Sequence, residues 1–453
     1  LTILYIRYFN CCYMLRIISK KSAFPLAGLS SGRSLSSYVS HETEVDLPEV
    51  RRSSIHSFFQ QGTGGRCSYS GDTCTVFGAS GVIGTAFVSR IVKKGVQLVI
   101  PYRRDPYDYR HLRTSGELGQ LYFFPYFLKD EDSIRTAVKY SNLVVNFIGA
   151  DYETKNFSYY DLHVDCARRI ARICREMGVK QLVHFSAMNA NVEPKEIYIP
   201  GGSNYLKSKA LGEIAVREEF PNAIIIRPGE VHCFADRFIN LYLSALRRSI
   251  ADEIALYAFG EKTFKAPVYV SIHFLNHMII SDIVSATIKV LFDPTAAGQT
   301  FELIGPYSYQ FGELVDWMYN KCCRGIGTGY ARRTPGICYT LKTLWFEMYA
   351  RAFRCQPRWS WEQLERTEAT SDVLTGCKTF EDLEIEPRCF EDSASVTLQL
   401  YDYHAPFRTA PEKVEPEPPK RYQHLRKNAK EASSIREIPE ALLDPLEGFK
   451  PAF

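Results

Sequence analysis

Three glycines at intervals of three residues are the part of this sequence best suited to hold a phosphate-bearing ligand. Gly78, Gly81 and Gly84 follow a short apolar run and open a stretch with helical periodicity, residues 82–93. In such a turn the first glycine permits a sharp exit from a strand, the second admits a pyrophosphate, and the third lets the helix pack on the sheet. Free N–H groups and the positive end of the helix dipole would face the phosphates. The pattern predicts a dinucleotide-binding turn, with a purely structural turn as the alternative.

The residue after the second predicted strand indicates which dinucleotide would bind. An acidic side chain in this place takes the ribose hydroxyls of NAD, whereas an arginine accommodates the 2′-phosphate of NADP. The chain reads Val99-Ile-Pro-Tyr-Arg103-Arg104-Asp105. Because the planar guanidinium of Arg103 suits a phosphate, the sequence favours NADP(H). Asp105 keeps NAD(H) as the alternative.

A tyrosine and a lysine four residues apart could move a proton. Tyr205 and Lys209 share one face of a predicted helix, and they fall between the fifth and sixth predicted strands, next to the crevice of such a sheet. A tyrosine hydroxyl can act as acid or base in hydride transfer, and a neighbouring ammonium lowers its pKa. Ser186, at the end of the fifth strand, could hydrogen-bond a reacting carbonyl. With 28 tyrosines the spacing also arises by chance, and Lys209 could serve the cofactor alone.

The elements that would position these residues alternate in type. From residue 74 to about 304, short β-branched runs alternate with amphipathic stretches. This predicts an α/β protein with an NAD(P)-binding Rossmann fold, a doubly wound parallel sheet and a smaller, mostly helical C-terminal region. The predicted strands are residues 74–77, 97–101, 121–124, 143–148, 181–185 and 223–226. The clearest helix is 160–177, with Ala167, Ile170, Ala171 and Cys174 on one face and Gly178 just past its end.

Composition divides the chain into four predicted regions. Residues 1–63 are predicted to be a mitochondrial presequence and N-terminal extension, because 14–41 contains arginine, lysine and serine but no acidic residue. A merely disordered basic tail is the alternative. Residues 64–305 are the predicted NADP(H)-binding domain and 306–409 a docking region. Residues 410–453 begin with a run rich in proline and glutamate and are predicted to be a disordered charged tail.

Charge, cysteines and hydropathy exclude other classes. A net charge of +4 over 453 residues does not argue for nucleic-acid binding. The thirteen cysteines include no Cys-x-x-Cys pair, so we expect reduced thiols, a non-secretory compartment and no metal site. No apolar run reaches the roughly 18 residues that a membrane-spanning helix needs.

Several short motifs resemble known families. The glycine turn, Tyr205-x-x-x-Lys209 and Arg227-Pro228-Gly229 resemble the extended and atypical short-chain dehydrogenase/reductase superfamily. A narrower set resembles the alpha subcomplex subunit 9 family, accessory subunits of mitochondrial complex I (NADH:ubiquinone oxidoreductase). That set is Val99-Ile-Pro-Tyr-Arg103, Gly119-Gln-Leu, Asn146-Phe-Ile-Gly149, Glu153-Thr-Lys-Asn-Phe157, Asn189-Ala-Asn191 and Ala266-Pro-Val-Tyr-Val270. The likeness extends from about Gly64 to Arg408 and is strongest before Gly305.

This resemblance implies a function. Members of the family are imported into mitochondria, lie on the matrix side of the inner membrane, and dock at the membrane-arm junction of complex I. They hold a tightly bound NADPH away from the electron path and have no established turnover. The resemblance therefore implies a non-catalytic accessory subunit that supports assembly or stability, contacts other complex I subunits and the membrane periphery, and binds no nucleic acid. The alternative is an NADP-dependent short-chain reductase or epimerase for a small substrate, using Ser186, Tyr205 and Lys209. The residues alone favour the enzyme, and the resemblance reverses that order.

The resemblance also implies roles for individual positions. Pyrophosphate, 2′-phosphate, nicotinamide ribose and nicotinamide would each meet a separate group of side chains. The pyrophosphate would meet Gly78, Ser80, Gly81, Val82 and Ile83, and the 2′-phosphate would meet Arg103. Lys209 would hold the nicotinamide ribose, and Pro228 and Val231 would lie against the nicotinamide. Asn146, Ile148 and Gly149 would flank the cofactor, and Gly84 and Tyr205 complete the expected cofactor-binding residues. One departure is that the family pattern passes from Val270 directly to Ser281. Residues 271–280 therefore resemble an insertion, either a loop peculiar to this organism or an error in the transcript. Residues after about Pro419 also lack a counterpart.

A basic, aromatic segment near the C-terminus is the candidate docking surface. Residues 331–360 contain six basic side chains and one acidic side chain, Glu347, a formal +5. The basic residues are Arg332, Arg333, Lys342, Arg351, Arg354 and Arg358. Residues 339–353 add tryptophan, phenylalanine and leucine, a composition that suits the boundary between water and anionic lipid. The alternative is an ordinary helix that packs its aromatic side chains on the domain core.

Overall fold

The computed structural model describes the greater part of the chain. The described residues are 70–103, 106–117, 119–154, 156–196, 199–232, 238–243, 254–256, 263–265, 268–269, 282–322, 332–333, 337–353, 357, 360–370, 372–401, 416–422 and 424. The predicted presequence, the apparent insertion 271–280, and Arg104, Asp105, Arg354 and Arg358 lie outside these residues.

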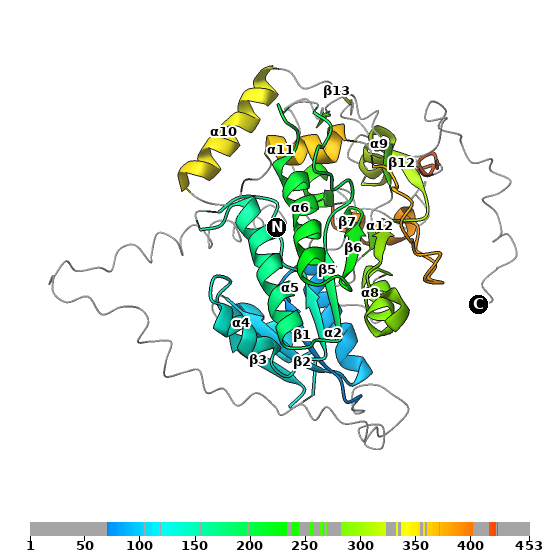
Figure 1. Cartoon of the computed structure of the whole chain (residues 1–453). Coiled ribbons are helices and arrows are strands. Elements are labelled where there is room, and N and C mark those ends of the chain that lie inside the picture. Colours follow the sequence, from blue (N-terminus) through cyan, green and yellow to red (C-terminus); the bar gives the residue numbers. More distant parts are fainter. Residues whose placement is uncertain are drawn as a thin grey trace, which may run out of the picture. The chain divides into compact units, whose positions relative to one another are not determined.

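A seven-stranded sheet, parallel throughout, forms the centre of the fold (Figure 1). Its strands in chain order are β1 (Thr73–Phe77), β2 (Gln97–Tyr102), β3 (Leu121–Pro125), β4 (Leu143–Asn146), β5 (Gln181–Phe185), β6 (Ile224–Pro228) and β11 (Thr300–Leu303). Their order in space is β11-β6-β5-β4-β1-β2-β3. The chain thus builds outward from β1 in one direction and from β4 in the other, and the strand order reverses between them. The predicted doubly wound parallel sheet is confirmed.

Six of these strands match the predicted ones, and β11 does not. Its sequence, Thr-Phe-Glu-Leu, carries a glutamate in the middle, and Glu302 is 1% exposed. Two groups distant in the chain hold its carboxylate: the Thr375 N–H donates to it at 3.0 Å, and Arg227 lies 3.5 Å away. A glutamate in the middle of a buried strand needs such tertiary partners, which the local sequence does not reveal.

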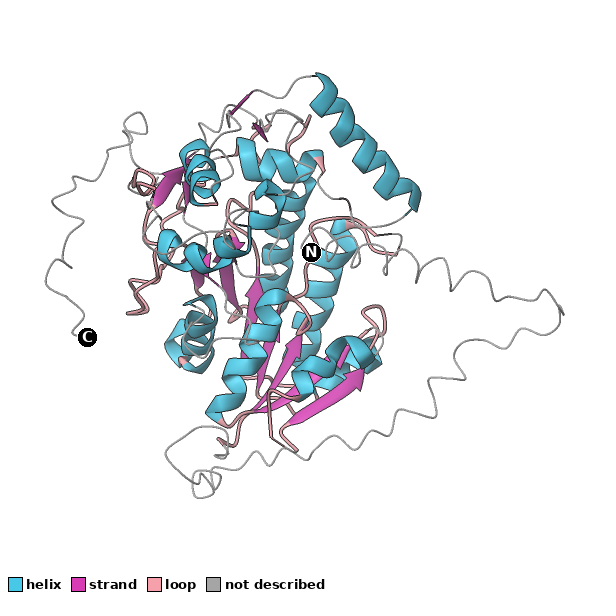
Figure 2. Cartoon of the chain, turned by 180° about the vertical axis from the view of Figure 1, so that it is seen from behind, coloured by secondary structure: helices cyan, strands magenta, loops and turns pink. Residues whose placement is uncertain are grey.

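Helices cover both faces of the sheet (Figure 2). Helices α2 (Val82–Ile91), α3 (Arg110–Arg113) and α8 (Asp282–Phe292) pack on one face. Helices α4 (Glu131–Val138), α5 (Cys166–Glu176) and α6 (Asn204–Glu219) pack on the other. Successive strand residues serve opposite cores, as Val144 and Val145 of β4 do, because side chains alternate along a strand.

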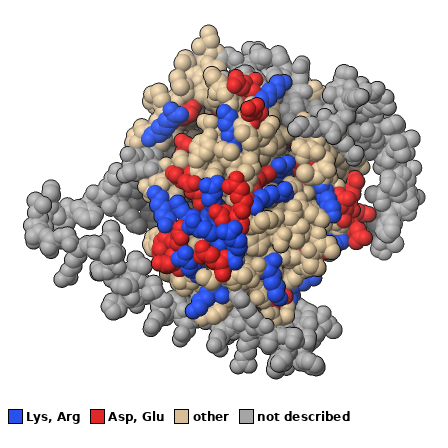
Figure 3. All heavy atoms as spheres, viewed as in Figure 1, with Lys and Arg blue, Asp and Glu red and all other residues tan. Residues whose placement is uncertain are grey.

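The predicted helix 160–177 is present, with a different first turn. Its predicted apolar face, Ala167, Ile170, Ala171 and Cys174, is buried, and Gly178 adopts a left-handed φ of +68° just past its end. The segment Asp161–Asp165, however, forms a π-turn before α5 begins. On the outer side of α4, α5 and α6, basic and acidic side chains are interspersed (Figure 3). Pairs such as Arg135–Glu176 and Arg168–Glu218 mark this as a solvated ionic surface.

A second core, rich in aromatic residues, lies in the C-terminal region. It joins α7 (Phe238–Leu243), α9 (Phe311–Lys321) and α12 (Phe390–Leu398), with large buried side chains including Tyr242, Tyr309, Phe311, Trp317 and Phe390. Helices α10 (Ile337–Phe353) and α11 (Trp361–Leu364) complete this region. The short strands are β7 (Val231–His232), β8 (Ile254–Ala255), β9 (Thr263–Lys265), β10 (Val268–Tyr269), β12 (Ser308–Gln310) and β13 (Arg332–Arg333). Among the described residues, no helix is both long and apolar enough to cross a bilayer.

Part of the predicted charged tail is anchored to the domain. Tyr422 and Ser308 exchange two backbone hydrogen bonds of 2.9 Å, so the tail pairs with the edge of β12. Arg421 forms an ion pair of 3.1 Å with the buried carboxylate of Glu391, and Ser308 Oγ lies 2.9 Å from Nδ1 of His424. The prediction of a disordered tail is therefore wrong at Arg421, Tyr422 and His424, because an available strand edge and a buried acid, which composition does not reveal, hold them in place.

Candidate functional site

The turn between β1 and α2 is shaped by its three glycines. Gly78 has a φ of +77°, and a Cβ at that position would lie 3.0 Å from the carbonyl carbon of Phe147. A Cβ at Gly84 would lie 2.5 Å from the carbonyl oxygen of Gly78, so the close packing of helix on turn requires glycine there. Gly81 is the N-cap residue of α2 and has no side chain to cap the helix, whose first turn contains no acidic residue. The backbone N–H groups at the N-terminal end of α2 are therefore suited to bind an anion.

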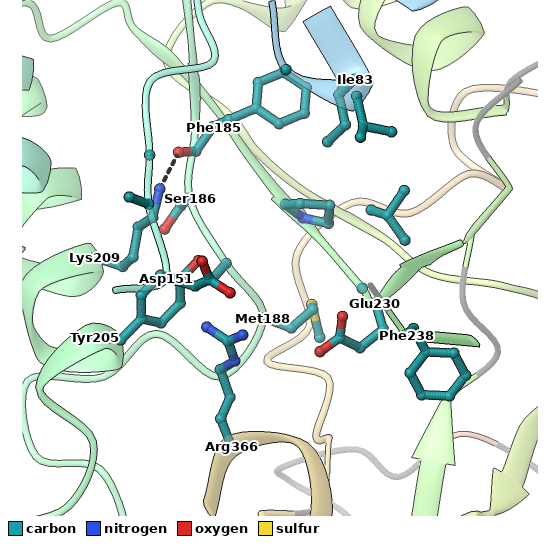
Figure 4. Close-up of a pocket in the computed structure, with 18 of the residues that line it drawn as sticks. Ile83, Asp151, Phe185, Ser186, Met188, Tyr205, Lys209, Glu230, Phe238 and Arg366 are labelled. Atoms are coloured by element: carbon teal, nitrogen blue, oxygen red, sulfur yellow. Dashed lines mark hydrogen bonds between the residues drawn. The ribbon is translucent and has the colours of Figure 1, made fainter. Parts of the chain in front are cut away.

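A cavity of about 400 Å³ opens over this turn, at the carboxyl ends of β1, β4, β5 and β6 (Figure 4). Its volume lies within the usual range for small-molecule sites. The predicted residues that line it are Gly78, Gly81, Val82, Ile83, Gly84, Gly149, Ser186, Tyr205, Lys209, Pro228 and Val231. Residues spread over more than 150 positions thus converge where the strand order reverses, which is where ligands bind in such sheets.

The other predicted residues stand beside or behind this lining. Ser80 is exposed on the glycine turn. Asn146 is buried at the end of β4: its Oδ1 accepts the Ile148 N–H at 3.0 Å, and its Nδ2 lies 3.2 Å from Nδ1 of His184. Asn146 and Ile148 therefore shape the strand exit that presents Gly149 to the cavity. Burial lowers the pKa of His184 to about 3, with the charge of Lys209 acting in the same direction.

Lys209 and Ser186 provide the polar wall of the cavity. The Lys209 ammonium donates a hydrogen bond of 3.1 Å to the Phe185 carbonyl, drawn as a dashed line in Figure 4. Burial lowers the pKa of Lys209 to about 8, against the opposing effect of Glu213. The Ser186 hydroxyl is buried and has no hydrogen-bond partner among the described residues. A buried hydroxyl normally has a partner, so this one fits a ligand that supplies one.

Tyr205 is not activated in the way the catalytic interpretation required. The Lys209 Nζ lies 6.0 Å from the centroid of the Tyr205 ring, and burial raises the pKa of the tyrosine above its ordinary value. The Arg366 guanidinium covers the same ring at 4.3 Å and opposes that rise without reversing it. The expectation that a neighbouring ammonium brings this pKa toward neutrality is therefore wrong, because desolvation is the larger effect.

Arg103 stands at the end of β2, outside the cavity lining. Its exposed guanidinium lies 5.7 Å from the centroid of the Phe157 ring, and the Nζ of Lys129 lies 5.3 Å from the same ring. Two cations thus meet beside the strand next to β1, on the aromatic residue of the Glu153–Phe157 motif. The sequence did not single out Lys129, because its partner lies 28 positions away.

The C-terminal region closes the far side of the cavity, which no local pattern indicated. Gln363, Arg366 and Thr367 line it from α11 and the π-turn that follows, Glu365–Ala369. The Glu362 carboxylate accepts the Tyr205 N–H at 2.5 Å and the Ser203 hydroxyl at 3.1 Å. In Figure 4, Arg366 points from this segment toward Tyr205 and Asp151.

A second connection ties this wall to the β5 exit. Asn189, which has a left-handed φ of +58°, donates from Nδ2 to Asp372 at 2.8 Å and accepts the Val373 N–H at 3.1 Å. An asparagine tolerates this conformation better than most residues. Asn189, the first residue of the Asn189-Ala-Asn191 motif, therefore helps to hold the C-terminal wall in place.

Together these groups suit an extended ligand that is anionic in the middle. Phosphates would meet the uncapped start of α2, and a polar ring would lie between Lys209 and Pro228. No cluster of three or more metal-ligating side chains occurs within the part of the chain that is described.

Comparison with known proteins gives a consistent picture. A family described as NAD(P)H-binding matches residues 78–233. The chain is 37% identical over 352 residues to the NADH dehydrogenase (ubiquinone) 1 alpha subcomplex subunit 9, mitochondrial, of Mus musculus, an alignment that covers 77% of this chain and 85% of that protein. It is 32% identical over 351 residues to the mitochondrial NADH-ubiquinone oxidoreductase 40 kDa subunit of Neurospora crassa, covering 77% and 84%.

Among solved structures, the fold is similar to the pinoresinol-lariciresinol and phenylcoumaran benzylic ether reductases. The TM-score is 0.51 at 13% identity, covering 72% of this chain and 98% of that one. At this identity the likeness concerns the fold alone.

Proposed function

Because this chain belongs to the family of the NADH dehydrogenase (ubiquinone) 1 alpha subcomplex subunit 9 proteins, we propose that it is an accessory subunit of mitochondrial complex I that binds NADPH and takes no part in catalysis. The observation that carries the proposal is sequence identity above 30% to proteins named as subunits of that complex, over some 85% of the length of each. The partners are then other complex I subunits, and the location is the mitochondrion, on the matrix side of the inner membrane.

The cavity supports a nicotinamide dinucleotide as the ligand. Gly81 and the uncapped start of α2 would hold the pyrophosphate. The Ser186 hydroxyl, which has no partner in the described part of the chain, and the Lys209 ammonium would hold the nicotinamide end. Arg103 and Lys129, which meet on one ring, would receive the 2′-phosphate and so favour NADPH over NADH. When bound, NADPH supplies a hydride donor, and the residues of this chain bind and orient it.

A bracing role is favoured over turnover by the state of Tyr205. Burial raises the pKa of its hydroxyl, and the Arg366 guanidinium covers its ring at 4.3 Å. A ligand present at a hundred times its Kd stabilises the native state by about 2.7 kcal/mol through mass action alone. The cofactor would therefore strengthen the contact between the Rossmann domain and the C-terminal wall, which both line its cavity.

A second candidate function is an NADP-dependent reductase or epimerase. The buried Ser186 hydroxyl, which no described residue hydrogen-bonds, favours it, because in that class of enzyme such a hydroxyl would meet a substrate carbonyl. Purified protein loaded with NADPH would then oxidise the cofactor in the presence of small carbonyl compounds.

Co-migration tests the proposal directly. Mitochondrial membranes of the source organism are solubilised in mild detergent, separated by native electrophoresis, and probed for this chain. We expect it in the band that carries NADH:ubiquinone oxidoreductase activity, and depletion of the chain should reduce that band. A chain that migrates only at low mass, in membranes where the large complex is intact, would refute the proposal.

We further propose that α10 attaches the subunit to the membrane surface. Its apolar side chains Ile337, Leu341, Leu344, Trp345, Met348 and Phe353 are exposed, with Ile337 at 79% and Trp345 at 63%. Among its aromatic residues, Tyr339 and Phe346 pack against the second core. The alternative of a helix that turns its apolar side chains to the core thus applies to part of α10 only. The formal +5 of 331–360 complements anionic head groups, and exposed tryptophan suits the interface.

A further inference from the structure

A buried histidine lies behind the cavity lining, between the exit of β4 and helix α6. His163 is 2% exposed and lies in the π-turn Asp161–Asp165, where the sequence pattern predicted an ordinary α-helix. Such turns are rare and often occur at functional sites. A Cβ at Gly212 of α6 would collide with the carbonyl oxygen of His163, so glycine lets this turn press directly against α6.

Hydrogen bonds fix the protonation of the imidazole. The Ser208 hydroxyl donates to the Tyr205 carbonyl at 2.8 Å, so it must accept at its 2.8 Å contact with His163 Nδ1. Nδ1 therefore carries the proton, and Nε2 accepts the Ala150 N–H at 3.4 Å. Burial lowers the pKa of His163 to about 2, with the charge of Lys209 contributing, so the ring stays neutral at physiological pH.

The imidazole thereby joins two parts of the chain that face the nicotinamide end. One is the exit of β4, where Gly149 and Ala150 line the cavity. The other is the face of α6 that carries Tyr205 and Lys209. The His163 ring meets the edge of the Tyr205 ring at 5.3 Å, and a Cβ at Gly149 would lie 3.8 Å from Nε2 and 3.1 Å from the Lys209 Nζ.

We propose that His163 is a positioning residue for the nicotinamide half of the cofactor. By holding the β4 exit against α6, it keeps the Gly149 backbone and the Lys209 ammonium side by side in the cavity lining, where both would meet the same part of the ligand. It does not itself line the cavity and acts through these residues. The inference rests on the proposed binding of NADPH.

The test separates the two halves of the cofactor. His163→Asn keeps an amide near the place of Nδ1 for Ser208 but cannot reach Ala150. Dissociation constants of the full-length protein are measured for NADPH and for 2′,5′-ADP, which lacks the nicotinamide half. Loss of one neutral hydrogen bond predicts a Kd for NADPH raised roughly three- to tenfold, with the Kd for 2′,5′-ADP unchanged within about twofold. His111→Asn, in α3 and away from the cavity, is the matched control and should change neither constant.

Each outcome has one meaning. An equal loss for both ligands would show that His163 supports the fold in general, and an unchanged NADPH constant would show that it positions nothing; either overturns the inference. If the unaltered protein binds neither ligand, the proposed NADPH function fails instead. Should His163→Asn not fold, Ser208→Ala removes the other partner of the same imidazole and is expected to weaken NADPH binding with the same selectivity.

Discussion

Replacing Arg103 with alanine examines the choice between NADPH and NADH at a single side chain. The guanidinium lies at the end of β2 beside Phe157, where the ribose of the adenosine half would meet the second strand. A charge-assisted hydrogen bond contributes about 1.5–3 kcal/mol, which corresponds to roughly ten- to a hundredfold in Kd. Because Arg103 is exposed and Lys129 remains 5.3 Å from the same ring, the lower end applies. We expect Arg103→Ala to raise the Kd for NADPH about tenfold and to leave that for NADH nearly unchanged.

The assay is a fluorescence titration of both cofactors, combined with chromatography of the cofactor released from denatured protein. The released material should be mainly NADP(H). Raising the salt concentration should narrow the difference between the two cofactors in the unaltered protein, since an exposed charge is screened. Arg113→Ala is the matched control, because that arginine also covers an aromatic ring, Phe123 at 5.4 Å, away from β1. Release of NAD(H) alone, or an equal loss for both cofactors, would refute the reasoning.

Three further predictions concern bracing, attachment and pH. Tyr205→Phe keeps shape and should leave complex I activity and assembly intact. Gly81→Val should deplete the assembled complex. A Cβ at Gly81 would meet only the Gly78 carbonyl oxygen, at 3.4 Å, among the described residues, so the valine side chain fits the fold but fills the place of the phosphate. Equal damage from both changes would favour the catalytic alternative. Replacing Arg351, Arg354 and Arg358 with glutamate should release the subunit from inner-membrane particles at moderate salt with NADPH retained, and persistence through the salt wash would place the docking surface elsewhere. Burial depresses the pKa of His163 to about 2 and of His184 to about 3 from an ordinary 6.5, so the unfolded chain binds more protons as the pH falls below 6.5. The urea midpoint should then fall from pH 7 to about pH 5.5 and fall less in His163→Asn, and identical slopes for the two proteins would contradict this assignment.

The local elements of the fold could be predicted from the sequence, because their causes are local. A buried parallel strand reads as a short β-branched run, and the turn after β1 requires glycine through its own dihedral angle and its own close contacts. The alternation of such runs with amphipathic stretches predicted the doubly wound sheet. The order of the sheet then placed Gly78, Ser186, Tyr205 and Pro228 at one edge, so most of the predicted residues line one cavity.

Tertiary structure decided the features whose causes are distant in the chain. β11 contains Glu302, a poor strand residue that is stable there because Arg227 and Thr375 meet its carboxylate. Arg366 covers Tyr205 from a segment some 160 positions later, and burial raises the tyrosine pKa that spacing alone suggested would fall. The contact of the π-turn at His163 with α6 likewise depends on Gly212, because a side chain there would collide with the His163 carbonyl. Desolvation and cross-chain hydrogen bonds depend on what surrounds a group in space, and neighbours in sequence do not specify those surroundings.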